Sequence, residues 1–109
     1  MKKNIIASLL LISSSMSAYS ANQSGTITTV LTDGTRFGGC MIQLSQDIGG
    51  TCKDNWVSLD CQGKFSGGGD RNYSNALLAF SLNKTVKVHF NGVQQHDGYC
   101  SVYRVDVLQ

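Results

Sequence analysis

The chain has 109 residues, of which 41% are hydrophobic and 15% are charged. That length allows one domain, and so few charges exclude a long acidic or basic disordered tail. The formal net charge is +2, but Lys2 and Lys3 account for it: nine basic residues less these two leave seven, against seven aspartates. A domain of zero net charge has no basic stripe for phosphates, which argues against nucleic acid as a partner.

Residues 1–20 have the layout of a secretory signal peptide. Two lysines precede a mostly apolar run over residues 5–12, and the small residues Ala18 and Ser20 then precede a cleavage site after Ser20. Cleavage after Ala21 is the alternative. The apolar run is far shorter than the roughly 20 residues that span a bilayer, so we expect no membrane span. The mature domain is expected to be residues 21–109, and the protein to be periplasmic or secreted.

Four cysteines lie in the expected mature domain: Cys40, Cys52, Cys61 and Cys100. An even number of cysteines in an oxidising compartment predicts two disulfides. No pair has the short spacing of a zinc site or of a redox CxxC motif, so we expect no metal and no cofactor. Three connectivities are possible. We favour Cys40–Cys52, which brackets a Gly-rich reversal, and Cys61–Cys100, which would tie the middle of the chain to its last strand.

Strand patterns dominate the first half of the domain. Residues 25–32 are β-branched almost throughout, and Asp33-Gly34 is a hairpin turn signal. Residues 36–44 indicate a second strand, interrupted by a bulge or close backbone approach at Gly38-Gly39. Residues 56–61 alternate, which places Val57, Leu59 and Cys61 on one face of a third strand.

After a Gly-rich loop over residues 63–71, the apolar period changes from two to about four. Asn72 is the expected N-cap of a helix, and Asn83 is expected to end it in the left-handed conformation. The expected buried stripe consists of Tyr73, Ala76, Leu77 and Phe80.

Residues 85–90 return to alternation, with Val86, Val88 and Phe90 on one face. A polar loop over residues 91–98 and a last strand over residues 99–108 follow. The chain is therefore mainly β with one helix, in the order strand, strand, strand, helix, strand, strand. This is the order of the small five-stranded barrel that binds oligonucleotides and oligosaccharides, the OB-fold, here with disulfide staples.

The titratable residues do not form a recognisable catalytic set. We expect His89 on the polar face of its strand and His96-Asp97 in a loop, all solvated, and no G-x-S-x-G motif supports a hydrolytic triad. Each acid is a short Asp in or beside a turn or strand end, which does not favour a glycosidase pair. We therefore expect a binding module and not an enzyme. For the aromatic residues the pattern leaves both a core role and a ligand contact open: Trp56, Phe90, Tyr99 and Tyr103.

Several short motifs lie between Ser24 and Phe90. They are Ser24-Gly25, Phe37 before the Cys40…Cys52 pair, Trp56 after it, YSNALLAF at 73–80 and VKVHF at 86–90. In these motifs the chain resembles the receptor-binding B subunits of the pertussis-like and subtilase-cytotoxin group of bacterial toxins. Residues 98–109 do not match that family's tail.

The resemblance implies an exported OB-fold barrel that forms a homopentameric ring. It implies binding to sialylated host-cell glycans, and possible delivery of a separate enzymatic A chain. By resemblance, Ser24 matches a serine that contacts sialic acid. Phe90 matches a tyrosine near the sugar, so the hydroxyl is missing in this chain. The alternative function is that of a small periplasmic OB-fold protein that binds a ligand or inhibits an enzyme.

Overall fold

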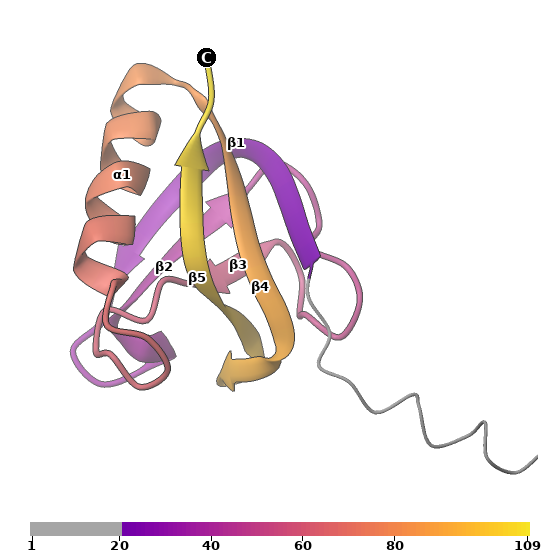
Figure 1. Ribbon diagram of the computed structural model, residues 1–109, viewed down its shortest axis with the longest axis vertical. Helices are drawn as coiled ribbons and strands as arrows, with labels where there is room; N and C mark the ends of the chain where they lie inside the picture. The colour runs from indigo at the N-terminus through magenta and orange to yellow at the C-terminus, as the bar shows by residue number, and fades with distance from the viewer. Residues whose placement is uncertain (1–20) are drawn as a thin grey trace, which may run out of the picture.

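The computed structural model describes residues 21–109, a mainly β domain with one helix (Figure 1). The elements in chain order are β1 (Ala21–Thr32), the 3-10 helix η2 (Phe37–Gly39), β2 (Cys40–Leu44), β3 (Trp56–Ser58), α1 (Gly69–Leu82), β4 (Thr85–His96) and β5 (Tyr99–Val107). The predicted order of strands and helix is confirmed. The predicted signal peptide, residues 1–20, lies outside the described residues.

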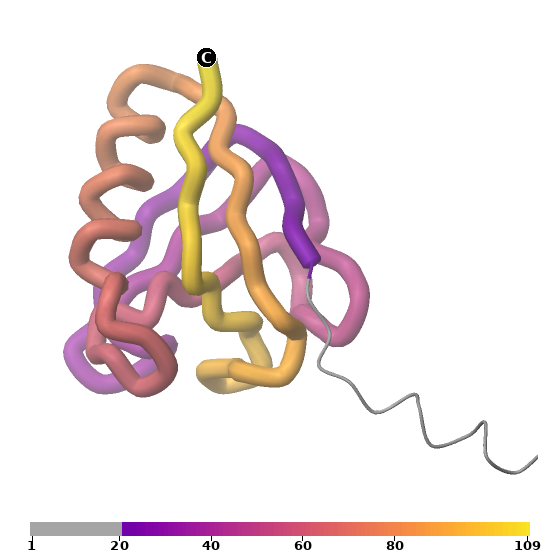
Figure 2. Tube along the Cα trace, viewed as in Figure 1, coloured from indigo at the N-terminus to yellow at the C-terminus, as the bar shows by residue number. Residues whose placement is uncertain are grey.

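The five strands form a sheet that closes into a ring in the order β1-β2-β3-β5-β4. Strand β1 is long and belongs to two pairings: residues Ala21 to Thr26 pair with β4, and Ile27 to Thr32 pair with β2. Figure 2 shows the bend of β1, which lets it pair with both β2 and β4. The junction of β3 with β5 is parallel and consists of one residue pair, Ser58 with Ser101, whereas the other pairings are antiparallel.

The core fills the ring with aliphatic side chains around Phe90, which is 1% exposed. Helix α1 contacts this core through Ala76 and Ala79, both fully buried, with Tyr73 partly buried beside them. The predicted burial of Leu77 and Phe80 is wrong, because these side chains are 38% and 44% exposed. The alanines lack long side chains, so the helix lies close to the strands on that face and the larger residues are turned outward.

Both ends of α1 are set by backbone geometry. The helix begins at Gly69 and not after the predicted cap Asn72, whose backbone N–H donates to Gly68 O inside the first turn. A Cβ atom on Gly69 would clash with the carbonyl oxygen of Asp60, so only glycine allows this approach. At the other end, Asn83 has φ of 54° and Lys84 N–H donates to Ala79 O, which confirms the predicted left-handed end.

The first strand starts at Ala21 and not at the predicted residue 25. Three other predicted boundaries of the strands are wrong for tertiary reasons. The second strand starts at Cys40, because Gly38 turns at φ of 72° where a side chain would meet Ser58 and His96. The third strand ends at Ser58, since the chain turns at Asp60 with φ of 57°. The predicted loop 91–98 is instead the bent end of β4, and the turn to β5 is only Asp97-Gly98.

The two predicted disulfides are present in number, but the predicted pairing is wrong. The bonds join Cys40 to Cys61 and Cys52 to Cys100, with Cα atoms 5.7 and 5.2 Å apart. Cys40 is the first residue of β2, and Cys52 lies in the loop that follows the last residue of β2, Leu44. At the rise per residue of a strand, Cys40 and Leu44 are about 13 Å apart. Cys40 instead lies beside the segment that follows β3, because β2 and β3 are antiparallel neighbours.

We predict that non-reducing peptide mapping of the protein, folded under oxidising conditions, finds Cys40 with Cys61 and Cys52 with Cys100. The bonds close loops of 21 and 48 residues, so loop-closure entropy gives about 3 and 4 kcal/mol of stabilisation. The double variant Cys52→Ser/Cys100→Ser should therefore lose more stability in urea than Cys40→Ser/Cys61→Ser. A peptide joining Cys40 to Cys52, or equal losses in the two double variants, would contradict this.

Candidate functional site

The outward face of β1, β4 and β5 carries two rows of polar side chains. Strand register places Ser24 opposite Lys87 and Lys87 opposite Asp106, which makes the first row. The second row runs from Asn22 through His89 to Arg104. Inward positions alternate with these, since Val86, Val88 and Phe90 are buried in the core. In Figure 1, α1 lies to one side of β4 and β5 and leaves their outer face uncovered.

Ser24 and Lys87 are the pair on this face that is available to a ligand. Directly opposed side chains of antiparallel strands have Cβ atoms about 5 Å apart. Among residues 21–109, no hydrogen bond uses the Ser24 hydroxyl and no ion pair uses the Lys87 ammonium. A hydroxyl donor beside an ammonium is a suitable receptor for a carboxylate, because both groups donate to anionic oxygen.

The nearby carboxylate of Asp106 is already paired with side chains of its own face. Its Oδ1 accepts a hydrogen bond from Arg104 Nε at 2.8 Å, and its Oδ2 lies 3.0 Å from His89 Nε2. Hydrogen bonds from Arg104 and then from His89 hold the pKa of the Asp106 carboxyl below its ordinary value. Because Asp106 is ionised and paired with Arg104, Lys87 remains as the excess positive charge of the face.

An aromatic ring borders these rows. The register shifts between His89 and Phe90, so both Tyr103 and Arg104 of β5 are exposed beside His89. The Tyr103 side chain is 46% exposed, and its ring lies at a tilt with its centroid 6.3 Å from that of His89. Irregularities of this kind redirect side chains at binding sites. The face therefore offers an apolar ring next to hydrogen-bond donors.

The structure does not bring the two predicted glycan-binding residues together. Ser24 is on the outward face, whereas Phe90 lies in the core between Ala21 and Val102 on its neighbouring strands. Of the two roles that the sequence left open for Phe90, the structure gives it the core role, because its ring shares the inward side of β4 with Val86. The same alternation places Lys87 and His89 outward, and it is the sequence signal that could have identified them.

The expectation that both histidines are solvated is also wrong. His96 is 8% exposed, and its Nε2 lies 2.8 Å from Oδ1 of the fully buried Asp60. Asp60 also accepts backbone hydrogen bonds at 2.8 to 3.0 Å from Lys64, Phe65 and Ser66. This carboxylate therefore joins the loop after β3 to the end of β4.

Asp97 also has a structural contact, in a cluster of aromatic and basic residues at η2, the β2–β3 loop and the start of β5. Its Oδ2 accepts a hydrogen bond from Phe37 N–H at 3.0 Å. The rings of Phe37 and Tyr99 pack edge to face, and Arg36 and Lys53 lie over them at 4.5 and 4.7 Å. Because the protein's own cations cover these rings, the cluster holds loops together and is a poor stacking surface for a ligand. Of the other aromatic candidates, Trp56 is half-buried.

No protein-family model matches the chain, and no curated protein or solved structure matches it. Within residues 21–109, no three His, Cys, Asp or Glu residues are grouped so that they could hold a metal ion. The described part of the chain likewise has no helix with the length and hydropathy of a bilayer span.

We predict that Asp60→Asn destabilises the fold by about 3 kcal/mol at pH 7, because the amide places a donor against buried donors. Burial raises the pKa of Asp60, but hydrogen bonds from Phe65, Ser66, His96 and Lys64 outweigh it and lower the net pKa below 3.8. Its stabilising contribution is thus complete above pH 3.8 and is lost as the pH falls through the folded-state pKa. Urea unfolding at pH 7 and pH 2 measures both effects.

The exposed Asp47 provides the matched control. Asp47→Asn should have the same free energy of unfolding as the wild type at both pH values. The difference in free energy of unfolding between the wild type and Asp60→Asn should be smaller at pH 2 than at pH 7. An equal difference in free energy of unfolding at pH 7 and pH 2 would refute the assigned role of Asp60.

Proposed function

We propose that the chain is an exported glycan-binding module of the OB-fold class that recognises an acidic, sialylated glycan on host cells. The observation that carries this proposal is the pairing of Ser24 with Lys87 on an uncovered sheet face. A sugar carboxylate would accept a hydrogen bond from the Ser24 hydroxyl and an ion pair from the Lys87 ammonium. Asn22 and Tyr103 border the same face, where a sugar presents hydroxyls and an apolar ring face.

The charge of the face favours an anionic ligand. Lys87 and Arg104 contribute two positive charges against one negative charge from Asp106, so the sum is about +1. Arg104 and His89 hold the carboxylate of Asp106 on their own side of the face. A ligand carboxylate at Ser24 therefore meets Lys87 with little opposition from Asp106. The attraction is exposed to solvent, so it should weaken with added salt.

Topology supports the OB-fold assignment. The ring order β1-β2-β3-β5-β4, with α1 between β3 and β4, is that expected of a five-stranded Greek-key barrel. Fold alone does not specify function, so the glycan proposal rests on the site. The two disulfides are consistent with an extracellular or periplasmic protein.

Resemblance to the toxin B subunits supports the choice of ligand. Ser24 matches the family's sialic acid serine, whereas the tyrosine position is occupied by the buried Phe90. In this chain we assign the aromatic contact to Tyr103, which is exposed on the ligand face. By the same resemblance, the partner is a separate enzymatic A chain. The assembly is a homopentamer, whose several shallow sites would raise the avidity for a cell surface.

We predict that Ser24→Ala weakens binding to sialyllactose by about ten- to a hundredfold, the cost of one hydrogen bond to a charged group. Lys87→Ala should weaken it comparably and reduce its salt dependence. Both substitutions are on the sheet surface and should leave the melting temperature unchanged. Calorimetric titration with sialyllactose and with lactose, which lacks the carboxylate, measures the effect.

Ser74→Ala and Lys84→Ala are the matched controls, since both residues are outside the β1, β4 and β5 face. They should bind sialyllactose as the wild type does. If Ser24→Ala bound sialyllactose with wild-type affinity, or if the wild type bound sialyllactose and lactose equally well, the proposed carboxylate site at Ser24 and Lys87 would be refuted.

A native mass spectrum of the mature protein should show five copies at micromolar concentration. Reduction of the two disulfides should shift the spectrum towards monomer, because the loops that they hold in place would become mobile. A monomeric mass under native conditions would refute the ring while leaving the carboxylate site to be judged by the titrations.

A further inference from the structure

The bend of β4 contains Asn91-Gly92, the one Asn-Gly pair in the sequence. Regular pairing with β5 is interrupted here, because the register shifts between Phe90 and Gln95. Gly92 has φ of 78°, and Asn91 is half-buried. The proposed carboxylate site on β1 and β4 does not use this pair.

The side-chain carbonyl of Asn91 lies against two backbone donors. Its Oδ1 accepts a hydrogen bond from Val93 N–H at 2.9 Å and another from Gln94 N–H at 3.0 Å. Two N–H groups at such distances are the arrangement that stabilises negative charge developing on a carbonyl oxygen. Because hydrogen bonds to a charged oxygen are roughly twice as strong as those to a neutral one, this pair of donors favours an oxyanion over the amide.

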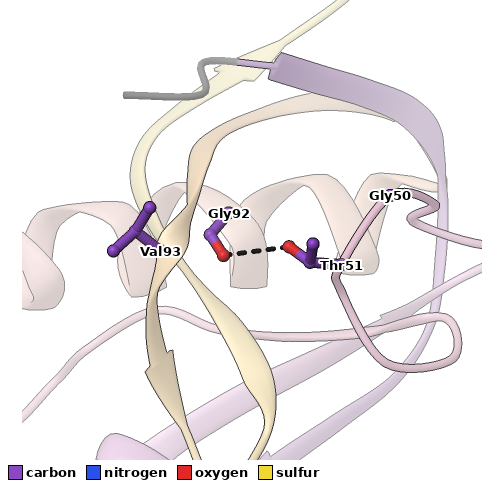
Figure 3. A pocket seen from close by; sticks show the side chains of 4 residues that line it. All are labelled: Gly50, Thr51, Gly92 and Val93. Atoms are coloured by element: carbon purple, nitrogen blue, oxygen red, sulfur yellow. Dashed lines mark hydrogen bonds between the residues drawn. The ribbon is translucent and has the colours of Figure 1, made fainter. Parts of the chain in front are cut away.

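The backbone nitrogen of Gly92 is placed to attack that carbonyl. In any Asn-Gly peptide this nitrogen is four bonds from the Asn Cγ, and rotation about two of these bonds brings the atoms into contact. Glycine has no side chain to obstruct the approach. The bend is anchored through the Gly92 carbonyl, which accepts hydrogen bonds from Thr51 Oγ1 at 2.9 Å, as Figure 3 shows, and from Gln95 Nε2 at 3.0 Å. Neither anchoring bond uses the nitrogen.

We propose that Asn91 is a self-modification site, at which the side-chain amide is converted into a carboxylate with water as the co-reactant. The Gly92 nitrogen gives its proton to solvent and bonds to Asn91 Cγ, while the negative charge passes to Oδ1 between its two donors. The Cγ–Nδ2 bond then breaks, and the nitrogen takes a proton from solvent and leaves as ammonia. Water opens the resulting succinimide ring at either carbonyl, which gives aspartate or isoaspartate. The formal charge of residues 21–109 changes from zero to −1.

The same two donors suit the aspartate product. A carboxylate at position 91 would accept charge-assisted hydrogen bonds where the amide accepts neutral ones. Asn91→Asp, which makes this product by substitution, should therefore melt no lower than the wild type at pH 7. These bonds lower the pKa of the new carboxyl in the folded state, so any gain is present above its ordinary value of about 3.9 and is lost at lower pH. A melting temperature at pH 7 below that of the wild type would overturn the assigned role of the donors.

Incubation of the folded protein at about pH 8.5, followed by peptide mapping, tests the reaction itself. Residue 91 should show the mass gain of an amide-to-acid conversion. The conversion should be about tenfold faster than in the same chain unfolded in guanidinium chloride, the difference between a charge-assisted and a neutral hydrogen bond. Asn22 and Asn83 are exposed and are followed by residues with side chains, so they should remain amides over the same time.

Two substitutions at Val93, whose side chain is 70% exposed, separate the donor from the side chain. Val93→Pro removes one of the two N–H groups and should slow the conversion, whereas the matched Val93→Ala keeps the N–H and should react like the wild type. If Val93→Pro does not fold, the comparison of folded with unfolded wild type decides. No conversion at residue 91, equal or faster conversion in the unfolded chain, or equal rates in the two folded Val93 variants would overturn the proposal. None of these measurements depends on glycan binding.

Discussion

Closure of the sheet depends on the junction between β3 and β5, which pair through Ser58 and Ser101 alone. One residue pair is a weak contact between parallel strands, and other bonds cross the same place. The disulfide from Cys52 to Cys100 joins the segment before β3 to β5. The buried pair of Asp60 and His96 joins the segment after β3 to the end of β4. Covalent and charged contacts therefore support the ring where its backbone pairing is shortest.

Because the ring is closed, residues of β1, β4 and β5 face either the core or the solvent, and alternation sets the side wherever the register does not shift. The core takes Val86, Val88 and Phe90, so Lys87 and His89 must point outward. The candidate site is thus a consequence of packing, since residues between core positions are presented together on the outer face. The register with β1 then adds Ser24 to that face.

Local patterns predicted the elements well where a local cause sets them. Alternation identified the strands, and Asn83 ended the helix because asparagine tolerates the left-handed backbone. The sequence pattern failed for α1, where the largest apolar residues were expected inside. Periodicity does not reveal that close approach to the strands requires alanine, so Ala76 and Ala79 are buried while Leu77 is turned outward. For the site, Ser24 came from a resemblance, and only the strand register placed Lys87 beside it.

The sequence by itself determined the number and order of the elements, the presence of two disulfides and the inward side of each clean strand. These depend on neighbours within a few residues. Only the tertiary structure decided the cysteine pairing, the burial of His96 against Asp60 and the pairing of β1 with both β2 and β4. Each of these joins residues far apart in the chain, and their contact follows from strand direction and register, which local propensity does not encode.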